Sequence, residues 1–189
     1  GERPAREVDA RLELGLEAVG VEPRRLAPRE LVTRHRGQPT LVIGQYIDQL
    51  DELGEMLDAP VIKGETPVKE RQRLFEAFRS GEVGLLVVSK VANFSIDLPE
   101  AAVAVQVSGT FGSRQEEAQR LGRLLRPKAD GRQAHFYTVV SRDTLDAEYA
   151  AHRQRFLAEQ GYAYTIVDAA DLAGPGEVNG PGWVDEPAD

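Results

Sequence analysis

The sequence lacks cysteine and any long apolar run, and its only histidines are His35, His135 and His152. Without cysteine the chain can form neither a disulfide framework nor a thiolate metal site. The three histidines do not have the spacing of metal ligands, so we expect no metal to bind to this chain alone. No apolar run reaches the length of a membrane span, and the first residues lack the apolar core of a signal peptide. The sequence therefore predicts a soluble, cytoplasmic protein with no membrane partner.

Nucleotide-binding signatures are also missing. There is no G-x-x-x-x-G-K-[ST] phosphate loop, and no D-E-x-H or D-E-x-D motif that could position Mg²⁺ and water. We therefore expect this chain to be unable to hydrolyse ATP alone. There is no G-x-G-x-x-G motif or compact acid–base pair either, so a small-molecule enzyme remains an alternative without a supporting motif.

The net charge of -8 is unevenly distributed along the chain. Residues 168 to 189 hold six acids and no lysine or arginine, and removing those six charges from -8 leaves -2 for the rest. Basic side chains gather in two regions: Arg24, Arg25, Arg29, Arg34 and Arg36, and Arg114, Arg120, Arg123, Arg126, Lys128 and Arg132. The acidic total therefore does not exclude a local phosphate-binding surface.

Short apolar runs alternate with helical patterns along the middle of the chain. The expected strands are 40–44, 60–63, 83–89, 102–107, 134–140 and 163–167. Two of these runs, VGLLVVS and AVAVQVS, are apolar almost throughout, which is typical of parallel strands buried on both faces. The pattern predicts a three-layer α/β domain of the doubly wound type, with a mostly parallel central sheet of about six strands.

The chain divides into three parts by composition. We expect residues 1–37 to be a helical lead-in from a preceding domain, residues 38–168 to form the α/β domain, and the acidic, Gly/Pro-rich residues 169–189 to be a disordered tail. Within the domain, Thr66 is the expected N-cap of a helix whose first residue is Pro67.

Residues 113–126, SRQEEAQRLGRLLR, predict a helix with one basic face. At roughly 100° per residue, Gln119, Arg123 and Arg126 fall within about 60° of one another, whereas the leucines lie opposite. Pro127 disfavours helical backbone at Arg126, so the helix should end there. Two arginines held in this way suit a polyphosphate, although the spacing alone also fits an ordinary solvated surface.

Three loops follow strands that should end at the same side of the sheet. Their residues are Gly44, Gln45 and Tyr46, then Gly64, Glu65 and Thr66, and finally Ser89 and Lys90. Hydroxyl and backbone N–H groups at such loop ends and helix N-termini can bind an anion.

The order Q-R-L-G-R-L-L-R, residues 119–126, resembles motif VI of superfamily 2 helicases. Upstream, SKVANFSIDLPEA resembles motif V, and KGETPVKER followed by FRSGE resembles the stretch between motifs IV and V. Residues 134–168 look like the end of the helicase domain in the xeroderma pigmentosum group B (XPB) family, in its bacterial type. The resemblance covers roughly residues 38 to 168. It departs from the family at Ala92 and Asn93, where the family has Gly-Asp.

This resemblance implies the second RecA-like lobe of an ATP-dependent DNA helicase or translocase, acting in DNA repair or duplex opening. Arg123 and Arg126 would be the catalytic arginine fingers, and Gln119, Gly122 and Asp97 would contact the nucleotide. The loops at 44–46, 64–66 and 89–90 would contact a nucleic-acid strand, mainly through its phosphates. ATP and Mg²⁺ would be held mainly by a first lobe absent from this chain. The implied partners are DNA, that N-terminal RecA-like lobe, and a repair nuclease or another repair protein. A non-catalytic nucleic-acid or protein binding module on the same fold remains the alternative.

Overall fold

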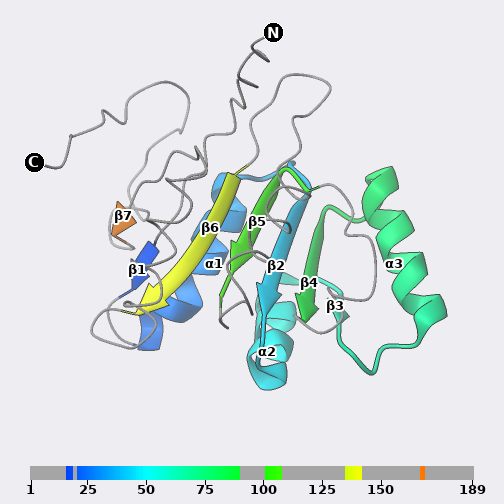
Figure 1. Cartoon of the computed structure of the whole chain (residues 1–189). Helices are drawn as coiled ribbons and strands as arrows, with labels where there is room; N and C mark the ends of the chain where they lie inside the picture. The colour runs from blue at the N-terminus through cyan, green and yellow to red at the C-terminus, as the bar shows by residue number, and fades with distance from the viewer. Residues whose placement is uncertain (1–15, 19–20, 90–100, 108–134, 142–166, 169–189) are drawn as a thin grey trace, which may run out of the picture.

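The computed structural model describes residues 16–18, 21–89, 101–107, 135–141 and 167–168. In this part of the chain, seven strands form one sheet in the order β3-β4-β2-β5-β6-β1-β7, and every pair of neighbours is parallel (Figure 1). The elements are β1 (Leu16–Ala18), α1 (Val21–Arg34), β2 (Thr40–Gly44), α2 (Ile47–Leu57), β3 (Val61–Ile62), α3 (Val68–Ser80), β4 (Leu85–Ser89), β5 (Val103–Gln106), β6 (His135–Ser141) and β7 (Val167–Asp168).

The core strands are buried on both faces of the sheet. Val42 and Val87 point to one face and pack in a cluster with Leu31 of α1 and Leu50 of α2. Residues that point to the other face of the sheet, such as Ile43, are also essentially inaccessible to solvent. Burial on both faces explains why these strands are apolar along their whole length rather than at every second residue.

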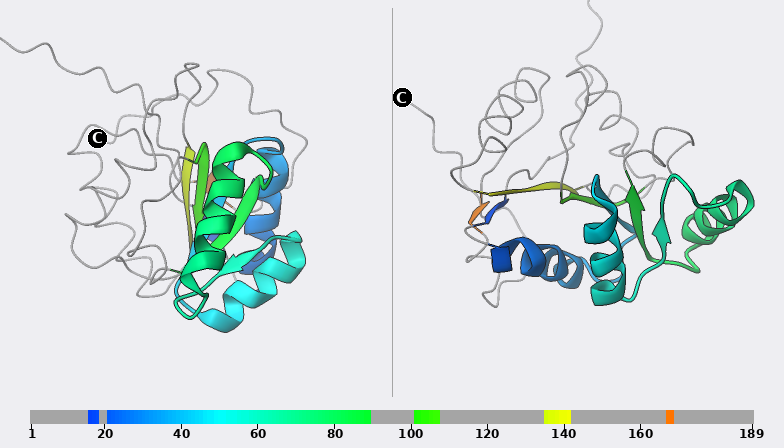
Figure 2. Two further views of the ribbon diagram at one scale, coloured as in Figure 1. Left: turned by 90° about the vertical axis from the view of Figure 1, so that its right-hand side faces the viewer. Right: turned by 90° about the horizontal axis from the view of Figure 1, so that it is seen from below.

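The helices pack with their apolar residues toward the protein interior. Helices α1 and α2 cover one face of the sheet, whereas α3 lies beside the β3–β4 side (Figure 2). In α3, Leu74, Phe75 and Phe78 recur at helical spacing and are buried. The helix ends at Gly81, whose φ of 83° is left-handed and favours glycine. Its N–H donates to the carbonyl of Phe78 over 3.2 Å.

Most sequence-based predictions of the elements are confirmed, and two are wrong. The α/β class, the parallel sheet and the 40–44 strand agree with the structure. The helical assignment of residues 1–37 fails at Leu16–Ala18, which forms a strand between β6 and β7. Thr66 is not an N-cap, because Pro67 occupies that position without a side-chain hydrogen bond. The domain boundaries at 38 and 168 stay predictions.

A close approach between α2 and β3 fixes the edge of the sheet. A Cβ atom added to Gly54 would lie 2.3 Å from Cγ2 of Val61 and 3.2 Å from the carbonyl oxygen of Ala59. Valine is branched at Cβ and cannot swing its methyl group away freely. Glycine at this position therefore sets how closely α2 packs on the strand that leads into the 63–66 loop.

We expect Gly54→Ala to destabilise the chain even though alanine is the better helix former. The helix gains about 1 kcal/mol from the exchange, whereas overpacking typically costs about 1–3 kcal/mol. Urea unfolding of the single variants and of the Gly54→Ala/Val61→Ala pair would test this. Removing the Val61 methyl groups should make Gly54→Ala stabilising, and an unchanged effect of Gly54→Ala in the two backgrounds would contradict the clash.

His35, at the end of α1, is tied to β6 through a buried hydrogen bond. Its Nε2 lies 2.7 Å from Oη of Tyr137, and both side chains are buried. The ring of His135 is 4.8 Å from that of His35, measured between centroids. Burial, and then the charges of His135 and Arg34, lower the pKa of His35 from its ordinary 6.5 to about 4.

This shift predicts a loss of stability in mild acid. Between pH 6.5 and about 4 the unfolded chain binds a proton at His35 that the folded chain does not, so the free energy of unfolding should decrease as the pH falls through that range. The full shift corresponds to on the order of 3 kcal/mol. Urea unfolding from pH 7.5 to 4 would measure it. His35→Gln should have a shallower pH dependence; parallel curves for the two proteins would exclude His35 as the source.

Candidate nucleic-acid interface at the carboxyl edge of the sheet

Parallel pairing places the carboxyl ends of β2, β3 and β4 side by side. Gly44, the last residue of β2, pairs with Ser89, the last residue of β4. Ile62 ends β3 opposite Val88, so the next residue along the chain, Lys63, continues beside Ser89. The loops that follow these three strands therefore begin at one edge, as the sequence predicted.

The predicted contact residues at this edge differ in exposure. Gln45, Tyr46, Gly64 and Glu65 are exposed, and Tyr46 has 62% of its surface accessible. Gly44 and Ser89 are buried. The side chains of Gln45, Tyr46 and Glu65 and the backbone of Gly64 can contact a ligand, whereas Gly44 and Ser89 are shielded from solvent.

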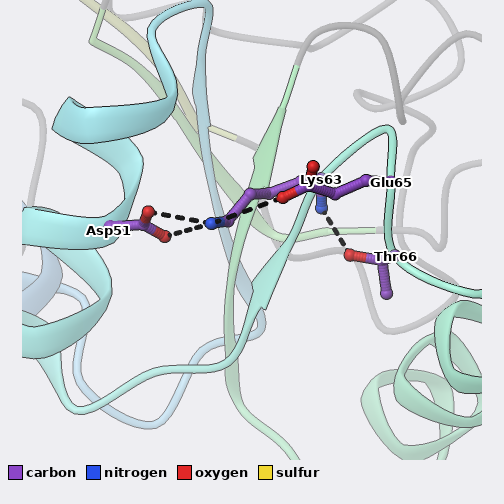
Figure 3. A network of polar contacts seen from close by, with 4 residues as sticks. All are labelled: Asp51, Lys63, Glu65 and Thr66. Atoms are coloured by element: carbon purple, nitrogen blue, oxygen red, sulfur yellow. Dashed lines mark hydrogen bonds and ion pairs between the residues drawn. The ribbon is translucent and has the colours of Figure 1, made fainter.

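Lys63 anchors the loop after β3 to helix α2. Its Nζ lies 2.8 Å from both carboxylate oxygens of Asp51 and 4.0 Å from Oε1 of Glu65 (Figure 3). The backbone N–H of Lys63 donates to Oγ1 of Thr66 over 2.9 Å, and the N–H of Thr66 donates back to the Lys63 carbonyl over 3.1 Å. This reciprocal pair explains why Thr66 does not cap α3: its hydroxyl closes the turn instead.

The ion pair keeps Lys63 charged. The hydrogen bond to Asp51 raises the pKa of Lys63 above its usual value; partial desolvation opposes this rise, and the charges of Asp51, Glu65 and Asp48 add to it. Lys63 is therefore fully protonated at neutral pH. Its charge is directed at neighbouring carboxylates rather than at solvent.

Arg71 of α3 is the second anchor of this loop. It is only 8% exposed, and its Nη2 donates to the carbonyl oxygens of Gly64 and Thr66, each over 2.9 Å. One guanidinium nitrogen thus holds two carbonyl groups of the loop. Sequence reasoning missed Arg71, Lys63 and Asp51 as members of the site. A signal existed for Arg71, which precedes Leu74, Phe75 and Phe78 on the apolar face of α3.

The remaining predicted site residues lie outside the described part of the chain. They are Lys90, Asp97, Gln119, Gly122, Arg123 and Arg126. Among the described residues, no three His, Asp or Glu side chains are grouped closely enough to hold a metal ion. None of the described helices is long and apolar enough to span a membrane.

The family described as ERCC3/RAD25/XPB C-terminal helicase matches residues 21–177. A protein of Kineococcus radiotolerans named DNA 3'-5' helicase XPB is 79% identical over 145 residues, which cover 77% of this chain and 26% of the relative. A Mycobacterium tuberculosis protein of the same name is 74% identical over 147 residues, covering 78% of this chain and 27% of the relative. The chain spans about a quarter of the length of these relatives.

Solved structures support the fold. The C-terminal domain of the DEAD-box protein Dbp5 is similar with a TM-score of 0.75 at 20% sequence identity, covering 87% of this chain and 94% of that one. The E. coli DEAD-box protein SrmB, in a crystal structure with RraA, gives a TM-score of 0.62 at 17% identity and covers 92% and 99%. Likeness at such low identity concerns the fold alone, and it agrees with the predicted RecA-like domain.

Proposed function

The chain belongs to the ERCC3/RAD25/XPB C-terminal helicase family, and on this basis we propose that it is the second motor lobe of an ATP-dependent DNA helicase or translocase. The observation that carries the proposal is the family match over residues 21–177, together with relatives at 79% and 74% identity that are named DNA 3'-5' helicase XPB. The chain corresponds to only about a quarter of those relatives. The lobe would therefore act as part of a longer motor.

In this motor, ATP and Mg²⁺ are held mainly by the first lobe, since this chain has no phosphate loop. Arg123 and Arg126 supply guanidinium groups, which form strong charge-assisted hydrogen bonds with phosphate oxygens. Gln119, Gly122 and Asp97 contact the nucleotide beside them. Bound ATP draws the lobes together through these contacts, and loss of the γ-phosphate contact lets them separate.

The loops at the carboxyl edge of the sheet contact one DNA strand. Exposed Gln45, Tyr46, Gly64 and Glu65 provide accessible polar and aromatic groups, and Lys90 adds a positive charge after Ser89. Contacts of this type address phosphates and sugars more than base edges, so binding should be independent of sequence. Alternating closure of the lobes then shifts this contact along the strand.

The partners, cellular location and biological process of the motor are proposed from the family likeness. The partners are DNA, the N-terminal RecA-like lobe of the same protein, and a repair nuclease or another repair protein. The protein works in the cytoplasm, in DNA repair or in the opening of duplexes. Residues 38–168 form most of the lobe, and β1 and α1, within residues 1–37, belong to the same sheet and core.

The arginine-finger assignment predicts a large kinetic effect. In the intact two-lobed protein, Arg123→Ala or Arg126→Ala should lower ATP turnover by about 10³-fold or more, the magnitude known for arginine fingers. Folding should be retained, because the predicted helix points these side chains away from its leucines. Steady-state ATP hydrolysis in the presence of DNA measures the effect.

Two controls make the result specific. Leu124→Ala, on the opposite face, should instead reduce stability by roughly 2–5 kcal/mol, as buried leucines do. The 189-residue chain without its first lobe should show no turnover at all. Near-normal hydrolysis in both arginine variants would favour an ordinary surface-charge role for Arg123 and Arg126.

Lys90→Ala should weaken DNA binding about equally on unrelated sequences. It should also reduce the slope of log affinity against log salt concentration by about one phosphate contact. Equilibrium titrations of the intact protein at several salt concentrations measure both quantities. Arg79→Ala is the matched control, since Arg79 is exposed in the last turn of α3 and pairs with Glu76. If Lys90→Ala changes neither affinity nor slope, Lys90 lies off the DNA path.

A further inference from the structure

We propose that a groove at the amino edge of the sheet binds residues 183–186 of the same chain, the segment Trp-Val-Asp-Glu in the acidic stretch after β7. Trp183 fills the groove, and Asp185 and Glu186 pair with arginines on one of its walls. The groove lies at the opposite edge of the sheet from the candidate nucleic-acid interface. The inference therefore does not rest on the proposed function.

The groove has a volume of about 760 Å³ and opens where β2 and β4 begin. Its walls are the second half of α1 with the turn after it, the end of α2, and the turn that joins α3 to β4. Half-buried apolar side chains line it: Val32, Met56, Leu57, Pro60, Val83 and Leu85. Most of them pack against the hydrophobic core, so their outer sides present apolar surface to an occupant.

A tryptophan suits a groove of this kind. Pockets that bind small ligands have volumes of about 300–1,000 Å³, so this one is large enough for an indole ring and the residues beside it. Tryptophan combines a large apolar surface with a single N–H donor, which favours sites that are apolar at one end and wet at the other. Asp58 and Glu82 also line the groove and offer carboxylate acceptors to that N–H. Trp183 is the only tryptophan of the chain.

The charges of the groove and of the segment are complementary. Arg29 and Arg36 line the α1 side and are exposed, and within the described part of the chain no carboxylate pairs with either guanidinium group. Residues 168 to 189 hold six acids and no lysine or arginine. Exposed ion pairs contribute little energy, so burial of the indole supplies most of the affinity. The carboxylates of Asp185 and Glu186 determine the direction in which the segment lies.

The chain from Asp168 to Trp183 is long enough to reach the groove. β7 lies four strands from β2 in the sheet, which is about 19 Å at roughly 4.8 Å per strand. The register places Asp168 five residues beyond the level of Thr40, or about 17 Å along the strands. The direct separation is therefore about 25 Å, whereas the 183 − 168 = 15 residue steps extend to about 50 Å.

Covalent connection favours this occupant over a separate molecule. A segment whose linker spans the distance has an effective concentration on the order of millimolar at its site. A modest apolar contact with two exposed ion pairs is then sufficient for binding. A second copy of the chain or another protein would need a tighter contact to compete.

The first test uses Trp183→p-benzoylphenylalanine, a photo-crosslinking substitution, in the intact protein. Irradiation should join position 183 to peptides of the groove, including the one that contains Met56, and mass spectrometry identifies them. Mixing isotopically labelled and unlabelled protein before irradiation distinguishes crosslinks within one chain from crosslinks between copies. We expect groove crosslinks within one chain.

Gly84 allows the groove to be filled without a clash. It is exposed and lines the groove, and a Cβ atom added to it would meet nothing within 4 Å. Gly84→Phe should abolish the groove crosslink and shift Trp183 emission toward that of tryptophan in water, because the phenyl ring takes the place of the indole. Trp183 emission is measured as the difference between spectra with and without Trp183→Phe. Gly84→Ala is the matched control, and it should leave both quantities unchanged.

Charge reversal tests the ion pairs. Arg29→Glu/Arg36→Glu should lower the yield of the groove crosslink by about fivefold, the effect of losing two exposed ion pairs. Asp185→Arg/Glu186→Arg in the same protein should restore the yield. Arg79→Glu should not change it, because Arg79 is outside the groove and pairs with Glu76. If circular dichroism shows that Gly84→Phe does not fold, the loss and rescue of the crosslink decide the question.

Several results would overturn the proposal. Crosslinks from position 183 to other parts of the chain, to a second copy or to another protein would each assign the segment elsewhere. The absence of a groove crosslink, or Trp183 emission that a folded Gly84→Phe variant does not change, would show that the groove does not hold the indole. None of these measurements depends on ATP turnover or DNA binding, so failure of the proposed function would be seen separately.

Discussion

Parallel pairing of β2 with β4 is the constraint on which the candidate site depends. Because the strands run in one direction, all of their carboxyl ends lie at one edge, and the register sets Gly44 directly beside Ser89. The pairing of Val61 and Ile62 with Val87 and Val88 then brings β3 to the same edge. Shifting a strand by one residue would exchange its two buried faces, so packing fixes the register and, with it, the distance between the loops.

Two charged side chains connect that sheet edge to the helices. Lys63 reaches back to Asp51 on α2, and Arg71 reaches from α3 to the loop carbonyls. Gly54 complements both by letting α2 approach β3 closely. The 63–66 loop is thus held from two helices and by its own turn. This arrangement suits a loop that must keep its backbone groups oriented when no ligand is bound.

The sequence predicted correctly those helices and strands that depend on the burial of residues close together in the chain. The β-branched run at 40–44 and the spacing of Leu74, Phe75 and Phe78 gave correct elements because burial decides both. Leu16–Ala18 escaped prediction, since three residues become a strand only through pairing with β6 and β7, far along the chain. The N-cap role predicted for Thr66 was wrong, because a hydroxyl at this position can bond either to the helix or to the turn, and here it bonds to the turn. Asp51 could not be found from sequence at all: its partner, Lys63, is brought near by the α2–β3 packing.

The same edge connects the two halves of the proposed mechanism. The segment that carries Gln119, Arg123 and Arg126 follows β5 directly, and β5 pairs with β2, the strand that leads to Gln45 and Tyr46. The Val107 N–H still bonds to the Ile43 carbonyl over 2.8 Å at the last step of that pairing. A force on the segment proposed to contact the nucleotide would therefore enter the sheet at β5, one strand away from β2 and its loop and two strands away from Ser89. Since buried parallel strands shift little relative to one another, the sheet should move as one body, and the loops proposed to contact DNA should follow the segment proposed to contact the nucleotide.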